Sequence, residues 1–210
     1  NLKYFEFKNL IEINNMNYFQ SRNEKNINNN YNLKIKKGEK IFIHGKTGRG
    51  KSTLLNIISG LISPDKGSVL VDNIEIKNNL RGWQQNISYV EQKAFLFKDN
   101  LKNNITMLED TKDFDEAYFK KILKICFLEE FYEKRKEQTL DEDGTLISGG
   151  EKQRIVIARA IYKNRKILIL DEATNAINSE IEEEILKNIL NKKNKNTIIC
   201  VSHNLKNKNI

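Results

Sequence analysis

Hydrophobic residues along the chain follow two patterns that predict strands of different kinds. Uninterrupted apolar runs are typical of parallel strands buried on both faces, and they cover residues 41–43, 167–170 and 197–201. Apolar residues that alternate with polar ones predict strands with one exposed face, and they occur within residues 2–19, 31–36 and 68–76. The last of these stretches is expected to form one or two edge strands, and residues 87–90 a further short strand.

Helical spacing begins in the second half of the chain. Residues 114–132 repeat apolar side chains at every third or fourth position, with Phe119, Ile122, Leu123, Cys126 and Phe127 on one side. Further helices are expected at Gly149–Tyr162 and at Ser179–Leu190, the latter with Ser179 as its N-cap. Between these elements, the Asn-rich stretch Ser21–Asn30 predicts a surface loop and Pro64–Gly67 a turn.

Strands therefore alternate with helices, an order that predicts an α/β fold with a mostly parallel sheet. We expect one domain in which residues 1–92 and 163–210 form an α/β core with an N-terminal antiparallel β subdomain. Residues 93–162 are expected to form an α-helical insert. Ligands of such folds bind beyond the carboxyl ends of the parallel strands.

The stretch Gly45–Thr53 reads GKTGRGKST and fits the pattern G-x-x-x-x-G-K-[ST]. It follows an apolar strand and opens a helix expected to end at Ser59–Gly60, the context that a phosphate-binding loop requires. Glycines let the backbone wrap around phosphates, and the helix N-terminus faces the anion. Lys51 is expected to place its charge on the β- and γ-phosphates, and Ser52 its hydroxyl on Mg²⁺. A chance glycine turn is the alternative that this context disfavours.

Asp171 and Glu172 follow the apolar run at residues 167–170. The first carboxylate can hold Mg²⁺, and the second can polarise a water molecule aimed at the γ-phosphate. An ordinary acidic pair at a strand end is the alternative. Because the pair lies downstream of a phosphate loop, we favour the hydrolytic interpretation.

Two further polar residues, Gln92 and His203, each come soon after a predicted strand. Gln92 could bridge Mg²⁺, water and the helical insert, and His203 could bond a γ-phosphate oxygen. Each is more often a surface residue when it stands alone. His44, just before the phosphate loop, is expected to be a structural residue at a strand end.

Residues 147–154 read ISGGEKQR and place a serine and two glycines at the start of a predicted helix. This is a second helix N-terminus suited to an anion. One nucleotide does not need two such sites from one chain, so Ser148–Gly150 could serve the nucleotide of a neighbouring subunit. An ordinary Ser-capped helix is the alternative.

Composition narrows the class of protein. Hydrophobic residues make up 39% and charged residues 30% of the 210 residues, which is typical of a soluble globular protein. No apolar run reaches the ~18 residues of a spanning helix, and the chain opens on Asn without a signal segment, so we expect a fragment of a longer protein. The net charge of +8 comes with Lys and Asn spread throughout, so no nucleic-acid partner is expected. Cys126 and Cys200 are expected to be buried, reduced thiols.

Taken together, these motifs resemble the ATPase domain of ATP-binding cassette (ABC) transporters over nearly the whole chain. GKTGRGKST resembles the Walker A motif, residues 89–92 the Q-loop, ILILDEAT the Walker B motif, and residues 201–203 the switch histidine. ISGGEKQR resembles the family signature, with Ile147 and Glu151 where Leu and Gln are usual. Residues 94–97 with Asn104–Ile105, and the acidic residues 141–144, are similar to exporter-type members.

The resemblance implies that two such domains, identical or not, clamp two ATP molecules head to tail. The clamp would drive a transmembrane domain of the same transporter from the cytoplasmic side of a membrane. The implied ATP-binding residues are Gly45, Lys46, Thr47, Gly48, Arg49, Gly50, Lys51, Ser52 and Thr53, with Ser148, Gly149 and Gly150 acting on the partner's ATP. The implied catalytic residues are Lys51, Gln92, Glu172 and His203, and the implied Mg²⁺ ligands are Ser52, Gln92 and Asp171.

Two positions depart from the family pattern. The D-loop usually ends in Asp, whereas residues 175–178 read NAIN, so Asn178 lacks the charge that normally acts across the dimer. Tyr18 and Phe19 are candidates for the aromatic residue that stacks on adenine, although strand phase points to Gln20.

Other functions stay open from the sequence. Soluble ABC ATPases act in DNA repair or on ribosomes; repair-type members carry a long coiled coil before the signature, whereas residues 52–148 are compact here. Ribosome-associated members carry two cassettes in one chain. A degenerate nucleotide-binding regulatory subunit is disfavoured because Lys51, Asp171, Glu172 and His203 are all present.

Overall fold

A computed structural model describes residues 5–19, 26–107, 114–140, 147–191 and 193–202 of the chain. These residues fold into two compact units, which are described separately here. Of the described residues, the first unit comprises 5–19, 26–87, 165–169 and 195–202, and the second comprises 88–107, 114–140, 147–164, 170–191 and 193–194. The predicted division into core and helical insert has different bounds and stays a prediction. None of the helices in the described ranges is long and apolar enough to span a bilayer.

The N-terminal part of the first unit is an antiparallel sheet, as predicted. Its strands are β1 (Leu10–Phe19), β2 (Asn26–Lys36), β4 (Lys66–Val71) and β5 (Ile74–Glu75), in the order β2-β1-β4-β5. Ile11 and Ile13 pair with Val71 and Val69 across β1 and β4, and all four side chains are buried. This face of the sheet is therefore part of the hydrophobic core.

Three expectations for this sheet were wrong in detail. Residues 26–30 were predicted as loop, but the backbone pairs with β1 at Tyr18↔Asn28 and Phe19↔Asn26, so pairing overrides their polar composition. The expectation of one or two edge strands at residues 68–76 holds for β5, which lies at the edge opposite β2, but not for β4, which lies between β1 and β5. The predicted turn at Pro64–Gly67 is instead irregular chain that enters β4 at Lys66.

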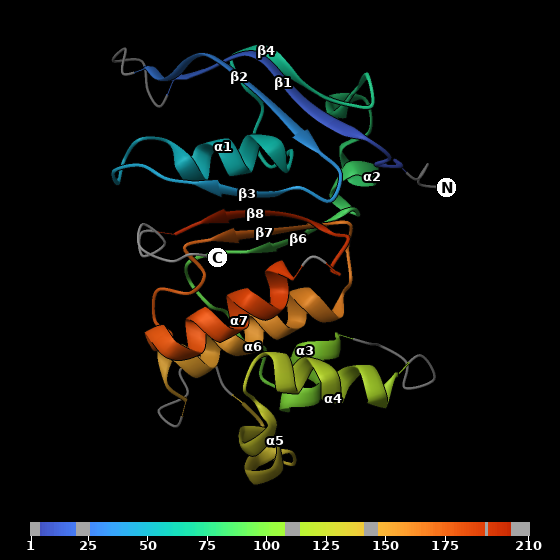
Figure 1. Cartoon of the computed structure of the whole chain (residues 1–210), viewed down its shortest axis with the longest axis vertical. Coiled ribbons are helices and arrows are strands. Elements are labelled where there is room, and N and C mark those ends of the chain that lie inside the picture. Colours follow the sequence, from blue (N-terminus) through green and yellow to red (C-terminus); the bar gives the residue numbers. More distant parts are fainter. Residues whose placement is uncertain (1–4, 20–25, 108–113, 141–146, 192, 203–210) are drawn as a thin grey trace. The chain divides into compact units, whose positions relative to one another are not determined.

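Helix α1 (Lys51–Ile58) lies between this antiparallel sheet and β3 (Lys40–Ile43), as Figure 1 shows. It buries Leu54, Leu55, Ile57 and Ile58, and ends at Ser59 and Gly60 as expected. The turn η1 (Ile76–Asn79) and α2 (Leu80–Gln84) follow β5. Trp83 of α2 is fully buried, and its indole N–H donates to the Ile58 carbonyl over 2.8 Å.

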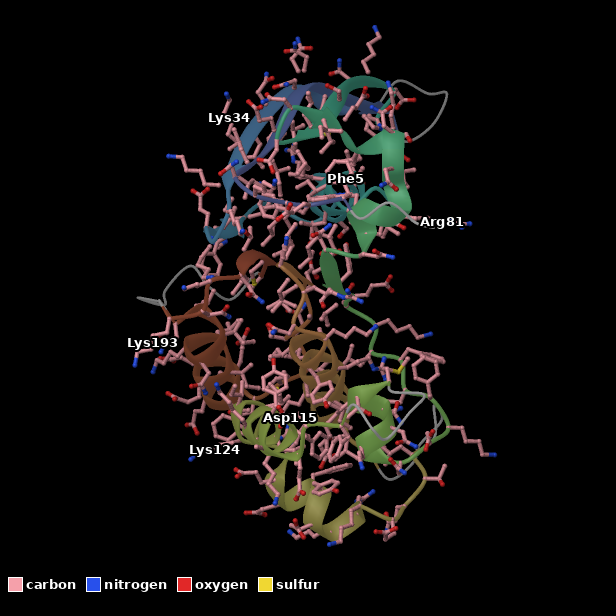
Figure 2. All side chains as sticks on the ribbon, turned by 90° about the vertical axis from the view of Figure 1, so that its right-hand side faces the viewer. Phe5, Lys34, Arg81, Asp115, Lys124 and Lys193 are labelled. Atoms are coloured by element: carbon pink, nitrogen blue, oxygen red, sulfur yellow. The ribbon has the colours of Figure 1, made fainter. Side chains whose placement is uncertain are left out.

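Phe5 and Phe7 pack edge-on against Trp83, with ring centroids 5.9 and 6.1 Å away. Figure 2 places Phe5 in the interior of this unit. Asn86 is also buried and donates to the Phe5 carbonyl and to the Gly82 carbonyl. These contacts join the start of the chain to α1 and α2 in one core.

The second sheet has the order β3-β8-β7-β6, with β6 at Ile87–Val90, β7 at Ile167–Asp171 and β8 at Thr197–Val201. Strands β3 and β8 are parallel, which confirms the predicted type of sheet. Every residue of β7 and β8 is buried, as their continuous apolar runs predict. The expectation for residues 41–43 was wrong, because β3 lies at the edge of this sheet and its side chains are only half-buried.

Helices dominate the second unit: α3 (Leu101–Thr106), α4 (Glu116–Ile125), α5 (Glu129–Arg135), α6 (Gly149–Tyr162) and α7 (Ser179–Leu190). Helices α3 and α4 pack against α6 (Figure 1). The single helix predicted over residues 114–132 is wrong: Phe127 has a φ of 55°, which separates α4 from α5. Phe119, Ile122, Leu123 and Cys126 are buried as expected, but Phe127 is 43% exposed.

Two smaller expectations concern a cap and the cysteines. The N-cap of α7 is Asn178 rather than Ser179, and the Asn178 carboxamide oxygen accepts from the Glu180 N–H over 2.9 Å. Cys126 and Cys200 are both buried as predicted, and burial raises the pKa of the Cys126 thiol to about 12. The positive charge is distributed over separate elements, as the outward-pointing Lys34, Lys124 and Lys193 illustrate (Figure 2).

Candidate nucleotide-binding site

The phosphate loop runs from the end of β3 into α1, within the first unit. Gly48 and Gly50 have φ values of 77° and 80°, a left-handed conformation that side chains other than glycine rarely adopt. A Cβ added to Gly48 would meet no atom within 4 Å, so this side of the loop faces open space. Residues 45–49 are exposed. The glycines are therefore required by the backbone, and the loop is accessible.

Lys51 is the first residue of α1, and its side chain turns back along the loop. It is only 9% exposed, and its ammonium group donates to the carbonyls of Gly45 (2.9 Å) and Lys46 (3.3 Å). This conformation places a buried positive charge beside the loop backbone. Ser52 is exposed and Thr53 half-buried at the start of the same helix.

The acidic pair lies in the second unit, where β7 ends. Asp171 is 7% exposed, and its carboxylate accepts a 3.1 Å hydrogen bond from the Tyr89 hydroxyl of β6. Burial raises the pKa of Tyr89, and the Asp171 charge and hydrogen bond raise it further, so this hydroxyl stays a donor at neutral pH. The contact holds the Asp171 carboxylate at the end of its strand.

Glu172 begins the turn that leads from β7 to α7. Its φ is 51°, which is uncommon for a glutamate and is a conformation often found at functional sites. Its carboxylate accepts from the Asn175 side-chain amide over 3.2 Å, and the Asn175 backbone N–H donates to the Glu172 carbonyl over 3.4 Å. The buried Thr174 hydroxyl donates to the buried Glu182 carboxylate over 2.7 Å, which ties the turn to α7.

Gln153, a residue of α6 that is 5% exposed, connects two of the predicted motifs. Its side-chain amide donates to the Gln92 carbonyl over 3.3 Å, and its side-chain oxygen accepts from the Ala176 N–H over 2.8 Å. The structure thus brings the Q-loop, the signature helix and the D-loop turn together within the second unit. The Gln92 side chain itself is exposed.

The N-terminus of α6 is closed by its own side chains. The Ser148 hydroxyl accepts from the Glu151 N–H (3.2 Å), and the Glu151 carboxylate accepts from the Ser148 N–H (2.8 Å) and hydroxyl (2.7 Å). Burial acts to raise the pKa of Glu151, but the hydrogen bonds from Ser148 and the nearby Arg154 and Arg135 charges outweigh it and lower the pKa. Glu151, an unusual residue in the resembled motif, is therefore a charged partner in a capping box.

A hollow of about 440 Å³ lies beside this helix start, lined by Ser148, Gly149, Gly150, Glu151, Arg154, Ala176, Ile177, Asn178 and Ile181. Gly150 is essential to its shape, because a Cβ there would lie 2.8 Å from the Ala176 carbonyl oxygen. The signature residues and the D-loop turn thus form one concave surface. Its size is sufficient for a phosphate-bearing group.

Several of the remaining predicted residues lie outside the described residues. Tyr18 is half-buried on β1, paired through its backbone with Asn28, and the side chain of Phe19 lies outside the described residues. His203, Gln20 and the acidic residues 141–144 also lie outside them. His44 stacks on Phe42 with ring centroids 6.5 Å apart, which is consistent with a structural residue.

Comparison with known proteins decides the family. The sequence profile of the ABC transporter family matches residues 28–175. The chain belongs to the ABC transporter family. The predicted fold class and the predicted likeness to exporter-type ABC nucleotide-binding domains are both confirmed.

Two relatives match nearly the whole of this chain. The chain is 33% identical over 206 residues to the ATP-dependent lipid A-core flippase of Pasteurella multocida (strain Pm70), covering 96% of this chain and 34% of the flippase. It is 38% identical over 196 residues to the multidrug resistance-like ATP-binding protein MdlA of Buchnera aphidicola subsp. Baizongia pistaciae (strain Bp), covering 90% of this chain and 34% of that protein. The chain therefore spans about a third of the length of these relatives.

A solved structure gives the same fold. A bacterial Atm1-family ABC exporter with ATP bound superposes with a TM-score of 0.87 at 26% identity, over 98% of this chain and 36% of that chain. The antiparallel sheet, the parallel sheet and the helical part are thus all features that an exporter of this family shares.

Three residues with specific contacts were missed by the sequence reasoning: Tyr89, Gln153 and Asn175. Tyr89 and Gln153 belong to motifs that were recognised, but neither position had been given a chemical task. Their polarity at positions that are half-buried or buried is the signal that could have identified them. Asn175 offered no such signal, because an exposed Asn in a turn is ordinary.

Proposed function

We propose that this ABC ATPase domain binds ATP with Mg²⁺, hydrolyses it, and thereby drives export of a substrate across a membrane. The observation that carries the proposal is the phosphate loop, with two left-handed glycines, an accessible backbone and the Lys51 cation at the start of α1. Helix N-termini and such loops bind phosphate. The solved exporter that resembles the chain has ATP bound, which supports the assignment.

Residues 45–53 would hold the phosphates. Backbone N–H groups of the loop would donate to phosphate oxygens, and Lys51 would leave its two loop carbonyls to contact the β- and γ-phosphates. Tyr18 or Phe19 would stack on the adenine. Ser52, Gln92 and Asp171 would hold Mg²⁺, which when bound neutralises charge that develops on the β- and γ-phosphate oxygens. Oxygen donors of these types are the ligands that Mg²⁺ prefers.

Hydrolysis would use Glu172 as the general base. A water oxygen forms a bond to the γ-phosphorus, its proton passes to the Glu172 carboxylate, and the bond from the γ-phosphorus to the bridging oxygen breaks. ADP leaves with that electron pair, and inorganic phosphate is released. His203 would bond a γ-phosphate oxygen, and Gln92 would orient the water and carry the change to the helical part.

The second anion site would act on a partner. Ser148–Gly150 line the hollow beside α6, and we propose that this surface closes on the ATP held by a second ABC domain, in a head-to-tail pair. A transmembrane domain outside the 210 residues would couple this closure to export, and the ATPase would then lie at the cytoplasmic face of a membrane. The relatives named above, an ATP-dependent flippase and a multidrug resistance-like protein, support this arrangement.

The test combines two variants of this chain. Glu172→Gln keeps a hydrogen bond to water but cannot accept a proton, so hydrolysis should fall by about 10²–10⁴. ATP and Mg²⁺ should still bind, because Lys51, Ser52 and Asp171 are unchanged. The isolated wild-type 210-residue domain, separated from the proposed membrane domain that would keep partners close, should run mainly as a monomer in gel filtration. Glu172→Gln with ATP should run as a dimer.

Adding Ser148→Arg to Glu172→Gln should return it to the monomer by filling the hollow beside α6. Asn191→Arg is the matched control. Asn191 is exposed and is the C-cap of α7, at the end opposite to Asn178, which lines the hollow, so the variant adds the same cation away from the hollow and should leave the dimer intact. Hydrolysis at the wild-type rate in Glu172→Gln would remove Glu172 from the role of base. A dimer that survives Ser148→Arg would refute the head-to-tail pair.

A further inference from the structure

The turn after β7 contains a direct contact between Glu172 and the side chain of Asn175. The Asn175 amide donates to the Glu172 carboxylate over 3.2 Å, and the Asn175 backbone N–H donates to the Glu172 carbonyl over 3.4 Å. Both hydrogen bonds link the same pair of residues. Asn175 therefore fixes the backbone of Glu172 at one end and its carboxylate at the other.

Glu172 needs such support because its backbone is in an uncommon conformation. A φ of 51° is strained for a residue with a long side chain and persists only where the surroundings maintain it. Two further contacts hold the turn. The Gln153 side-chain oxygen accepts from the Ala176 N–H, and the Thr174 hydroxyl donates to the buried Glu182 carboxylate. These contacts anchor the backbone of the turn, and the Asn175 amide reaches the Glu172 carboxylate itself.

We propose that Asn175 is a positioning residue for hydrolysis, which donates to the Glu172 carboxylate and aims it at the attacking water. The proposal rests on the function of Glu172 as general base proposed above. Asn175 does not touch the reacting atoms. It acts by restricting the carboxylate to one orientation, and a base displaced by about 1 Å can lose up to about 10² in rate.

Two variants of nearly the same size separate this role from a structural one. Asn175→Leu removes the donor without adding charge, and should lower kcat about 3- to 10-fold. Asn175→Asp replaces the donor by a carboxylate that repels Glu172 and turns it away, and should lower kcat by roughly 10- to 100-fold. In both variants the Kd for ATP should stay within about twofold of wild type, because the phosphate loop is untouched.

A purely structural role for Asn175 predicts the opposite order. Asp is a good turn residue that keeps the side-chain oxygen and the solvent contact of Asn, whereas Leu is not. Activity that is better preserved in Asn175→Asp than in Asn175→Leu would therefore overturn the proposal. Thermal unfolding of each variant tests the same point, since the expected loss of kcat occurs without a matching loss of stability.

Glu172→Gln and Asn191→Asp complete the experiment. Asn191→Asp adds the same charge at the exposed end of α7, where the Asn191 side-chain oxygen accepts from the Lys193 N–H, and kcat should be unchanged. In the Glu172→Gln background, Asn175→Asp should have no further effect on the residual rate. If Glu172→Gln hydrolyses ATP normally, the proposed function fails. If Glu172→Gln is impaired and Asn175→Asp matches wild type, only the role of Asn175 fails.

Discussion

The two helices that start after a glycine-bearing motif, α1 and α6, begin in physically different ways. The N-cap of α1 is Gly50, which has no side chain to cap the helix, and its first turn carries no acid but the cation Lys51. The N-cap of α6 is Ser148, which forms a complete capping box with Glu151. A cation is unfavourable at the positive end of a helix dipole, whereas an acid is favourable there.

This difference indicates which of the two helix starts is organised to bind the anion of a ligand. At α1, an incoming phosphate would supply the negative charge that the sequence itself does not provide. At α6, Glu151 already supplies that charge, so a phosphate of a partner's nucleotide would have to share Ser148 with the carboxylate. The sequence interpretation described both starts as suited to an anion, and the structure shows that only the start of α6 carries an acidic side chain of its own.

The largest effect should follow from changing the cation of α1. Lys51→Met keeps most of the buried stem but removes the ammonium group, and hydrogen bonds from charged groups contribute about 1.5–3 kcal/mol. ATP affinity measured by calorimetry should fall about 10- to 150-fold, while the free energy of unfolding without ATP should change little, since the dipole no longer opposes a cation. Lys66→Met, at an exposed residue of β4, is the control. Unchanged ATP affinity in Lys51→Met would contradict the inference that the start of α1 is organised to bind a phosphate.

The second effect concerns the glycines of α6. Gly150→Ala places a Cβ 2.8 Å from the Ala176 carbonyl oxygen, so α6 and the D-loop turn must move apart. The free energy of unfolding by urea should fall by about 1–3 kcal/mol. Gly149→Ala is the matched control, because its Cβ would meet only the Ala176 Cβ at an ordinary 3.5 Å. Equal losses of the free energy of unfolding in the two variants would show that the close contact at Gly150 does not cause the destabilisation.

Much of the fold could be predicted because it depends on local hydrophobic pattern. The continuous runs of β7 and β8 and the spacing of α6 left few alternatives, and the phosphate loop was recognisable from nine adjacent residues. The break between α4 and α5 was not predictable, because Phe127 continues the apolar spacing and only its positive φ interrupts the helix. Strand pairing at residues 26–30 was missed for a similar reason, since a partner strand overrides local polarity.

The candidate site was predictable as a set of residues but not as a set of contacts. Motif spacing identified Lys51, Asp171 and Ser148, yet it gave no indication that Gln153 connects Gln92 with Ala176. That link joins backbone groups of two segments through the side chain of a third, and only tertiary structure brings these segments together. The capping box was likewise overlooked, although Ser148 and Glu151 have the spacing of one.

The smallest effect should follow from neutralising the acid of α6. Glu151→Gln can still complete the capping box, so it isolates the contribution of the charge at the helix start. At pH 7 the variant should lose about 0.3–1 kcal/mol of the free energy of unfolding. The pKa of Glu151 is lowered from 4.5 in the folded protein, so the carboxylate stabilises the fold above the pKa of the unfolded chain. This stabilisation is lost as the pH falls through the lower folded pKa.

Urea unfolding of wild type and Glu151→Gln should therefore differ at neutral pH and converge below pH 4.5, the ordinary pKa of the side chain. Glu137→Gln, at an exposed residue outside any helix, is the control for losing one acid from the chain. A difference between wild type and Glu151→Gln that persists unchanged into acid would mean that packing, not charge, distinguishes the two side chains. Convergence would mean instead that the charge of Glu151 stabilises the start of α6, whereas the start of α1 has no acid of its own and must obtain an anion from a ligand.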